Sequence, residues 1–139
     1  MHRVFLLVLA CAAFGGCDNT TTTPAPTPLP LPLIKETFPG TLAPGASAFH
    51  SFTVVQAGEV DITLTAAGPP PTITMGLAVG VPNTTTGACD LIPGASVNAQ
   101  ASQFSQLLGS ASPGALCVKI SDIGNQTGPI TYTIVVEHT

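Results

Sequence analysis

The sequence predicts an all-β protein, an antiparallel β-sandwich of about eight strands. The composition is the first reason: 45% of the 139 residues are hydrophobic, only 7% are charged, and there are 14 glycines and 14 prolines. This balance is typical of short strands joined by many turns. The second reason is that short segments alternating between apolar and polar residues recur along the chain. The length allows one domain with additional segments.

The third reason is the pattern near the C-terminus. Segments 115–120 and 130–136 both alternate, and the turn-forming residues 122–129 separate them. The alternation gives each segment one apolar face, made by Leu116, Val118 and Ile120 in the first and by Ile130, Tyr132, Ile134 and Val136 in the second. We expect a β-hairpin with one apolar side, which a second sheet must cover.

Taken in order, the chain begins with residues 1–16, which resemble a bacterial lipoprotein signal peptide. One basic residue precedes the apolar segment 4–14, which is far shorter than the roughly 20 residues of a membrane span. Gly15 and Gly16 then precede Cys17. The resemblance implies that Cys17 is lipidated and anchors the protein to a bacterial membrane, on the periplasmic or surface side. Two alternatives stay open: lipidation at Cys11, and an ordinary signal peptide with an incidental cysteine.

Residues 17–34 read as the lipidated cysteine followed by a tether. Four consecutive threonines precede prolines at every second position from Pro24 to Pro32. Alternating proline excludes helix and removes the donors of a sheet, which leaves polyproline II. At about 3.1 Å per residue, such a tether would hold a domain roughly 50 Å from the membrane.

The globular domain is predicted over residues 35–139. Strands are expected over 36–42, 49–55 and 59–66, and the last of these alternates cleanly between polar and apolar residues. A fourth strand is expected to bury Ile73, Met75, Leu77 and Val79. Its other face, formed by Thr72, Thr74, Gly76, Ala78 and Gly80, lacks bulk, so we expect the following loop to pack closely there.

Residues 82–112 are the hardest to place. Val97, Ala101, Phe104 and Leu108 follow helical spacing over 97–108, which makes helix an alternative. Serine, asparagine and glutamine fill the positions between them, and glycine stands at both ends. In an otherwise β chain, we interpret this region as short strands.

Cysteine counting leaves one pair for the mature domain. Cys11 would leave with the signal peptide and Cys17 would be lipidated, so Cys89 and Cys117 remain. A disulfide between them suits an oxidising, exported compartment. The alternative, a two-cysteine metal site, has no neighbouring histidine or cysteine to complete it.

Several strand patterns together resemble bacterial pre-peptidase C-terminal (PPC-like) domains. They are Phe52-Thr53-Val54, the segments 58–64 and 113–120, and Tyr132-Thr133-Ile134. The resemblance covers residues 35–139 and implies a jelly-roll β-sandwich with optional calcium. No acidic residues match the family's calcium ligands, so no metal site is carried over, and Leu116 stands where the family often has an aromatic residue.

The sequence contains none of the common catalytic or phosphate-binding motifs. There is no Gly-x-Ser-x-Gly, no His-Glu-x-x-His and no phosphate-binding glycine loop. We interpret His50 as a structural residue that touches the core, and 122–125 as an Asx-type turn rather than half of a cation site. Glu59 and Asp61 are expected to be solvated. No catalytic residue, metal or cofactor is therefore predicted, and the protein is not expected to be an enzyme.

Charge excludes one class of partner. The only basic residues are Arg3, Lys35 and Lys119, and the net charge is −4, so a row of phosphates could not be neutralised and nucleic acid is excluded. We therefore predict a lipid-anchored, non-enzymatic binding or accessory module of the cell envelope, with a glycan or protein ligand. The loops 81–88 and 122–129, at one end of the sandwich, would form its binding surface. The alternative is a structural surface-coat lipoprotein without a specific ligand.

Overall fold

The computed structural model describes residue 29 and residues 32–139. The signal peptide, Cys11, Cys17 and most of the tether lie outside these described residues. All regular structure within them is β, in eight strands: β1 (Ile34–Leu42), β2 (Ser47–Val54), β3 (Gly58–Gly68), β4 (Met75–Asn83), β5 (Ala88–Ala99), β6 (Leu107–Ala111), β7 (Gly114–Asp122) and β8 (Ile130–His138).

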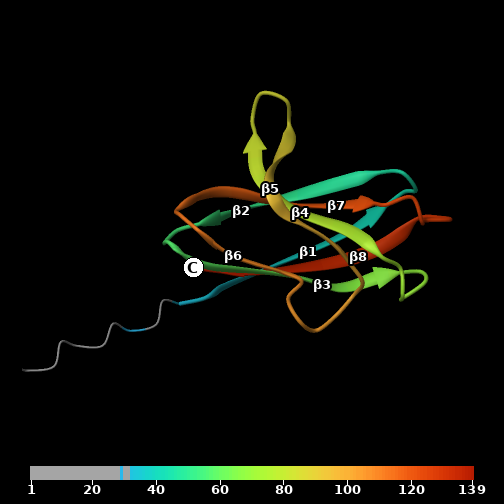
Figure 1. The fold of residues 1–139 in the computed structure, drawn as a ribbon, viewed down its shortest axis with the longest axis horizontal. Coiled ribbons are helices and arrows are strands. Elements are labelled where there is room, and N and C mark those ends of the chain that lie inside the picture. Colours follow the sequence, from blue (N-terminus) through green and yellow to red (C-terminus); the bar gives the residue numbers. More distant parts are fainter. Residues whose placement is uncertain (1–28, 30–31) are drawn as a thin grey trace, which may run out of the picture.

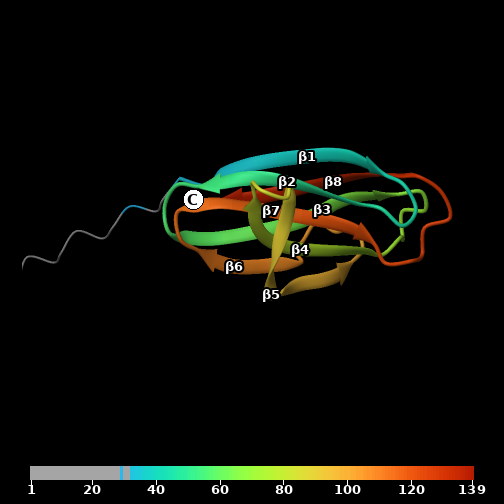
Figure 2. The ribbon, with the colours of Figure 1, turned by 90° about the horizontal axis from the view of Figure 1, so that it is seen from above.

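The strands form two four-stranded antiparallel sheets packed face to face (Figures 1 and 2). One sheet has the order β1-β8-β3-β6, and the other has the order β2-β7-β4-β5. Apart from β4 and β5, strands that follow one another in the chain lie in different sheets. Two sheets related in this way form a jelly roll, so the predicted fold class is confirmed.

The core lies between the sheets and is built from alternate residues of the central strands. The predicted inward faces of the last two strands are confirmed, because their apolar side chains are buried or packed against the core. The aliphatic and methionine side chains most fully enclosed are Val54, Ile62, Leu64, Met75, Leu77, Val118, Ile120, Ile130, Ile134 and Val136. Burying one such side chain contributes on the order of 1.5–3 kcal/mol, which makes this layer the main source of stability.

The predicted hairpin between the last two strands is wrong. β7 pairs with β2 and β4, whereas β8 pairs with β1 and β3, so the two apolar faces meet across the core from opposite sheets. The connection over 123–129 crosses from one sheet to the other, and it is longer than the two to five residues typical of hairpins. Alternation defined which face of each strand is apolar, but it carried no information about the neighbouring strand.

The region that was hardest to place is extended. β5 runs for twelve residues and β6 for five, and residues 97–108 contain no helix. β5 is therefore longer than the short strands we predicted. Its register with β4 shifts between Ala78 and Gly80, which leaves Ile92 to Ala95 without partners on β4. A bulge of this kind bends the strand away from its sheet.

The predicted close packing on the small face of β4 is confirmed at Gly80, although the main chain of strand β5 supplies it and not a loop. A Cβ atom at Gly80 would touch the main-chain oxygen of Asp90 and lie 2.8 Å from Sγ of Cys89. Glycine at this position therefore lets the main chain of β5 at Asp90 and the disulfide approach β4 closely.

Gly80→Ala is expected to destabilise the domain by about 1–3 kcal/mol, because the new methyl group must displace main-chain atoms. Gly109→Ala is the matched control, since a Cβ atom there meets nothing within 4 Å. Its effect should stay within about 0.5 kcal/mol. Urea denaturation of the three proteins measures both values, and equal stabilities for the two variants would contradict the close packing.

Candidate functional site

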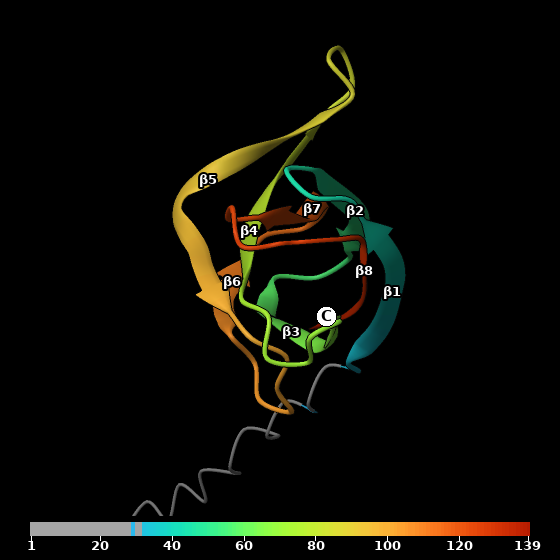
Figure 3. The same cartoon turned by 90° about the vertical axis from the view of Figure 1, so that its right-hand side faces the viewer.

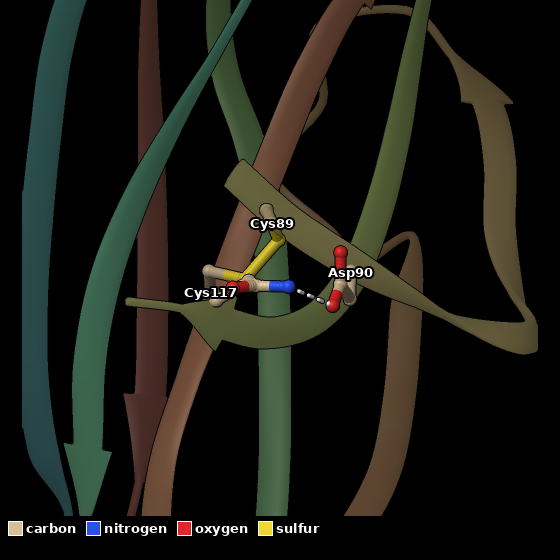
Figure 4. Close-up of a disulfide and its surroundings, with 4 residues drawn as sticks. Cys89, Asp90 and Cys117 are labelled. Atoms are coloured by element: carbon tan, nitrogen blue, oxygen red, sulfur yellow. Dashed lines mark hydrogen bonds between the residues drawn. A yellow bond between two sulfur atoms is a disulfide. The ribbon is translucent and has the colours of Figure 1, made fainter. Parts of the chain in front are cut away.

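The disulfide joins β5 to β7 on the outer face of the second sheet (Figure 4). The Cα atoms of Cys89 and Cys117 are 6.0 Å apart, inside the range of about 4.4–6.8 Å that a disulfide spans. The predicted pairing is therefore present. Beside it, Nδ2 of Asn83 donates to Oδ2 of Asp90 over 2.8 Å. These two links tie the ends of β4 and β5 together and to β7.

Beyond the disulfide, β4 and β5 form an arm, residues 81–90, that projects from the sheet (Figures 1 and 3). Its turn is held by Asn83, whose Oδ1 accepts from the main-chain N–H groups of Thr85 and Thr86. Asn83 forms such a turn because its short amide reproduces a main-chain acceptor.

The predicted loop surface at one end of the sandwich is wrong. Met75, at the start of β4, pairs with Asp122, where the loop 123–129 begins. Asn83, at the other end of β4, pairs with Ala88 across the tip of the arm. The two loops therefore lie at opposite ends of one strand, because consecutive loops of a jelly roll alternate between its ends.

The turn predicted at Asp122 is confirmed. Its Oδ1 accepts from the main-chain N–H groups of Gly124, Asn125 and Gln126, and its Oδ2 accepts from that of Gly45 at 2.8 Å. The hydrogen bond from Gly45 is the main cause that lowers the pKa of Asp122 below its usual value. The carboxylate thereby joins the β7–β8 connection to the β1–β2 loop.

Asp122→Asn is expected to lower the melting temperature most at neutral pH. A depressed pKa means that the carboxylate stabilises the fold above the ordinary value of 3.8, and that this stabilisation is lost as the pH falls through the folded-state pKa. The difference between wild type and variant should therefore shrink on acidification below about pH 4. Asp61→Asn is the control, and thermal denaturation from neutral to acidic pH measures both. A difference that stays constant with pH would contradict the role of the charge.

His50 lies where a structural histidine was expected. Its Nε2 is 2.9 Å from the hydroxyl of Tyr132, and its ring stacks on Phe38 with centroids 5.0 Å apart. Burial lowers the pKa of His50 and raises the pKa of Tyr132. The tyrosine passes over Gly40, where any side chain would collide with its ring. These contacts link β8 in one sheet to β2 in the other.

His138 is the residue that the sequence reasoning missed. Its side chain is fully buried, its Nε2 lies 2.9 Å from Oε1 of Glu36, and its ring packs against Phe52. The signal was present, because 138 continues the inward series 130, 132, 134 and 136 by one step. Among the described residues, neither histidine ring is hydrogen-bonded to a serine or cysteine side chain. No group of three or more acidic, histidine or cysteine side chains in this part of the chain could hold a metal ion.

A large hollow lies on the side of the sandwich where β5 and β6 form the free edges of the two sheets. We call it the side cleft: a cavity of about 650 Å³ lined by residues 92–95, 107–116, Val60, Ile62 and Val79. It exists because the β5 bulge bends away from β4 while β6 stays paired with β3. No ionisable side chain lines it, and Leu108 at its rim is 72% exposed.

The residues that line the side cleft indicate which kind of ligand it can bind. No residue of the lining carries an acidic, basic or imidazole side chain, so the lining has no side chain able to transfer a proton near neutral pH. A volume of this size falls in the range of ligand pockets, about 300–1,000 Å³. The side cleft is therefore suited to binding apolar groups.

Fold and cleft together define a disulfide-linked jelly-roll domain with an apolar cleft between its free sheet edges. Searches of protein-family models and of curated proteins found no match to the chain. None of the described residues belong to a helix long and apolar enough to cross a membrane.

Proposed function

We propose that this protein is an exported, lipid-anchored, non-enzymatic binding module of the cell envelope, and that the side cleft receives an extended segment of a partner protein. The observation that supports this most is the combination of an apolar cleft with an unprotected sheet edge. A PPC-like domain held on a lipidated tether suits such a role, because the tether lets the cleft reach partners some distance from the membrane.

The edge strand β6 supports strand addition. It pairs with β3 only, so its other edge has no strand partner among the described residues. Sheet edges are usually blunted by charge, proline or a bulge, but Leu107–Ala111 contains none of these. The adjoining edge of β3 is covered, because Leu64 and Ile62 accept main-chain hydrogen bonds from Ser102 and Gln106. β6 is thus the place where a partner strand can gain main-chain hydrogen bonds.

Charge indicates the partner segment. An uncharged cleft favours an occupant without charges at its inward positions, because burying an unpaired charge is costly. Glu59 and Asp61 on β3 lie opposite Ser110 and Leu108 of β6 in the sheet register. These two carboxylates lie one strand in from the free edge, so a neutral or basic segment of another protein is favoured over an acidic one.

Selection from a display library of random short peptides tests this site. Enriched peptides should alternate apolar residues and lack proline and acidic residues. Leu108→Asp should weaken the binding of these peptides about tenfold or more. Phe104→Asp should leave binding unchanged, since Phe104 is also a large, mostly exposed apolar residue but lies outside the cleft lining. Failure to enrich peptides, or equal loss with both variants, would overturn the assignment and favour a surface-coat role.

The anchor is tested separately at Cys17. We expect Cys17→Ser to abolish incorporation of labelled fatty acid and to release the protein from the membrane fraction, because a single folded domain has no other hold on the bilayer. Cys11→Ser is the matched control and should keep incorporation. Incorporation that persists in Cys17→Ser but is lost in Cys11→Ser would assign the anchor to the other cysteine. The disulfide supports export, because such bonds persist in oxidising compartments.

A further inference from the structure

The outer face of the second sheet, away from the core and from the side cleft, carries an unusual set of side chains. The register of four strands places Phe49, Lys119, Ala78 and Ser96 in one row across it, and Ser47, Ser121, Gly76 and Asn98 in the next. Residues directly opposite on neighbouring strands share a face and lie about 5 Å apart. One aromatic ring, one ammonium group and several hydroxyl and amide groups are therefore gathered on this face.

A hollow of about 350 Å³ lies in this face, and we call it the outer groove. Gly76 and Ala78 of β4 line its base, and the side chains of Ser121 and Ile123 lie directly over Gly76. Leu91 and Ile123, both substantially exposed, stand at its rim. Its polar lining consists of Ser96, Asn98, Lys119 and Ser121.

Lys119 is the charge that sets the chemistry of this groove. Of the two lysines in residues 32–139, Lys35 is bound to Glu137 at 2.8 Å, whereas Lys119 has no carboxylate within 4.0 Å among the described residues. Nearby acids are engaged elsewhere: Asp90 accepts from Asn83, and Asp122 accepts from four main-chain N–H groups. An ammonium group is thus left free in a domain that carries six carboxylates.

We propose that the outer groove binds an acidic sugar, a pyranose that carries one carboxylate. The hydroxyl and amide groups of Ser96, Asn98 and Ser121 can exchange hydrogen bonds with sugar hydroxyls. Phe49 lies outside the groove lining, but it is the cross-strand neighbour of Lys119, and its partly exposed ring offers an apolar surface beside the groove for the C–H face of the sugar. Lys119 then pairs with the carboxylate as a point charge.

The same charges argue for a single carboxylate over a phosphate or a dense polyanion. Phosphate recognition normally uses bidentate arginine or several converging N–H groups, and residues 32–139 contain no arginine. One ammonium group balances one monoanion. A ligand with many closely spaced charges would be repelled by a domain whose own net charge is negative.

Calorimetric titration with a disaccharide ending in glucuronate, and with the matching neutral glucose disaccharide, tests the proposal. We expect low-millimolar binding of the acidic sugar and at least about tenfold weaker binding of the neutral one. Lys119→Gln should remove this preference. Lys35→Gln is the matched control, because it changes the net charge equally and should leave both affinities within about twofold.

Three outcomes would overturn the proposal: no binding of the acidic disaccharide up to the solubility limit, equal loss in both lysine variants, or displacement of the sugar by inorganic phosphate at equal concentration. Phe49→Ala should weaken both sugars together, because the ring contacts the part they share. Leu108→Asp, which alters the side cleft, should leave sugar binding unchanged. The two sites can therefore fail independently.

Discussion

Reduction of the Cys89–Cys117 bridge is expected to lower the free energy of unfolding by about 3–4 kcal/mol. The bridge spans 28 residues of sequence, and the chain-entropy model gives that amount for a loop of this length. A domain of this size has a total stability on the order of 5–15 kcal/mol, so the loss is a large fraction. Urea denaturation with and without reductant measures it, and a change below about 1 kcal/mol would contradict the prediction.

The loss has a local component that a second measurement can separate. The bridge fixes the base of the β4–β5 arm to β7, and Cys117 is fully buried beneath it. Hydrogen exchange in the reduced protein should rise most over residues 81–91 and least in the centres of β3 and β8. Cys89→Ala is the gentler control for the lost bond, because Cys117→Ala also leaves a cavity. Alkylation of the native, non-reduced protein should label neither cysteine.

The sequence predicted strand faces well and strand partners poorly. Alternation in segments such as 115–120 is a property of adjacent residues, so it can be read locally. Whether that strand pairs with β8 or β4 depends on contacts far apart in the chain, and a pattern shared by every strand cannot distinguish them. The hairpin was wrong for this reason. The disulfide was predictable because counting left two cysteines and one possible pair.

Neither the side cleft nor the outer groove could be predicted from the sequence, and the reasons are related. The side cleft depends on a bulge that frees Ile92 to Ala95 from β4. The pair Pro93-Gly94 marks a turn at this position, but it does not show that the strand continues past the turn and leaves a cleft beside it. The outer groove depends on the register that sets Phe49 and Lys119 side by side. Which lysine is paired depends on a contact between Lys35 and Glu137, 102 residues apart in the chain, so no local pattern could predict it. The small face of β4 was the one local signal, and it predicted close packing by the following segment without showing that this occurs at Gly80.

Two leucines provide the sharpest separation of folding from binding. Leu64 of β3 is 0% exposed in the core, whereas Leu108 of β6 is 72% exposed at the rim of the side cleft. Leu64→Ala is expected to cost about 2–5 kcal/mol, since it removes buried methyl groups and leaves a cavity. Leu108→Ala should change stability by no more than about 0.5 kcal/mol, because its side chain already faces water.

The comparison bears on function because both substitutions remove the same atoms. If Leu108→Ala leaves the urea midpoint unchanged yet weakens the selected peptides, the leucine serves the partner and not the fold. A loss of stability close to that of Leu64→Ala would show instead that Leu108 packs into the domain in solution. The side cleft would then be partly filled by its own rim, and the free edge of β6 would no longer be open to a partner strand.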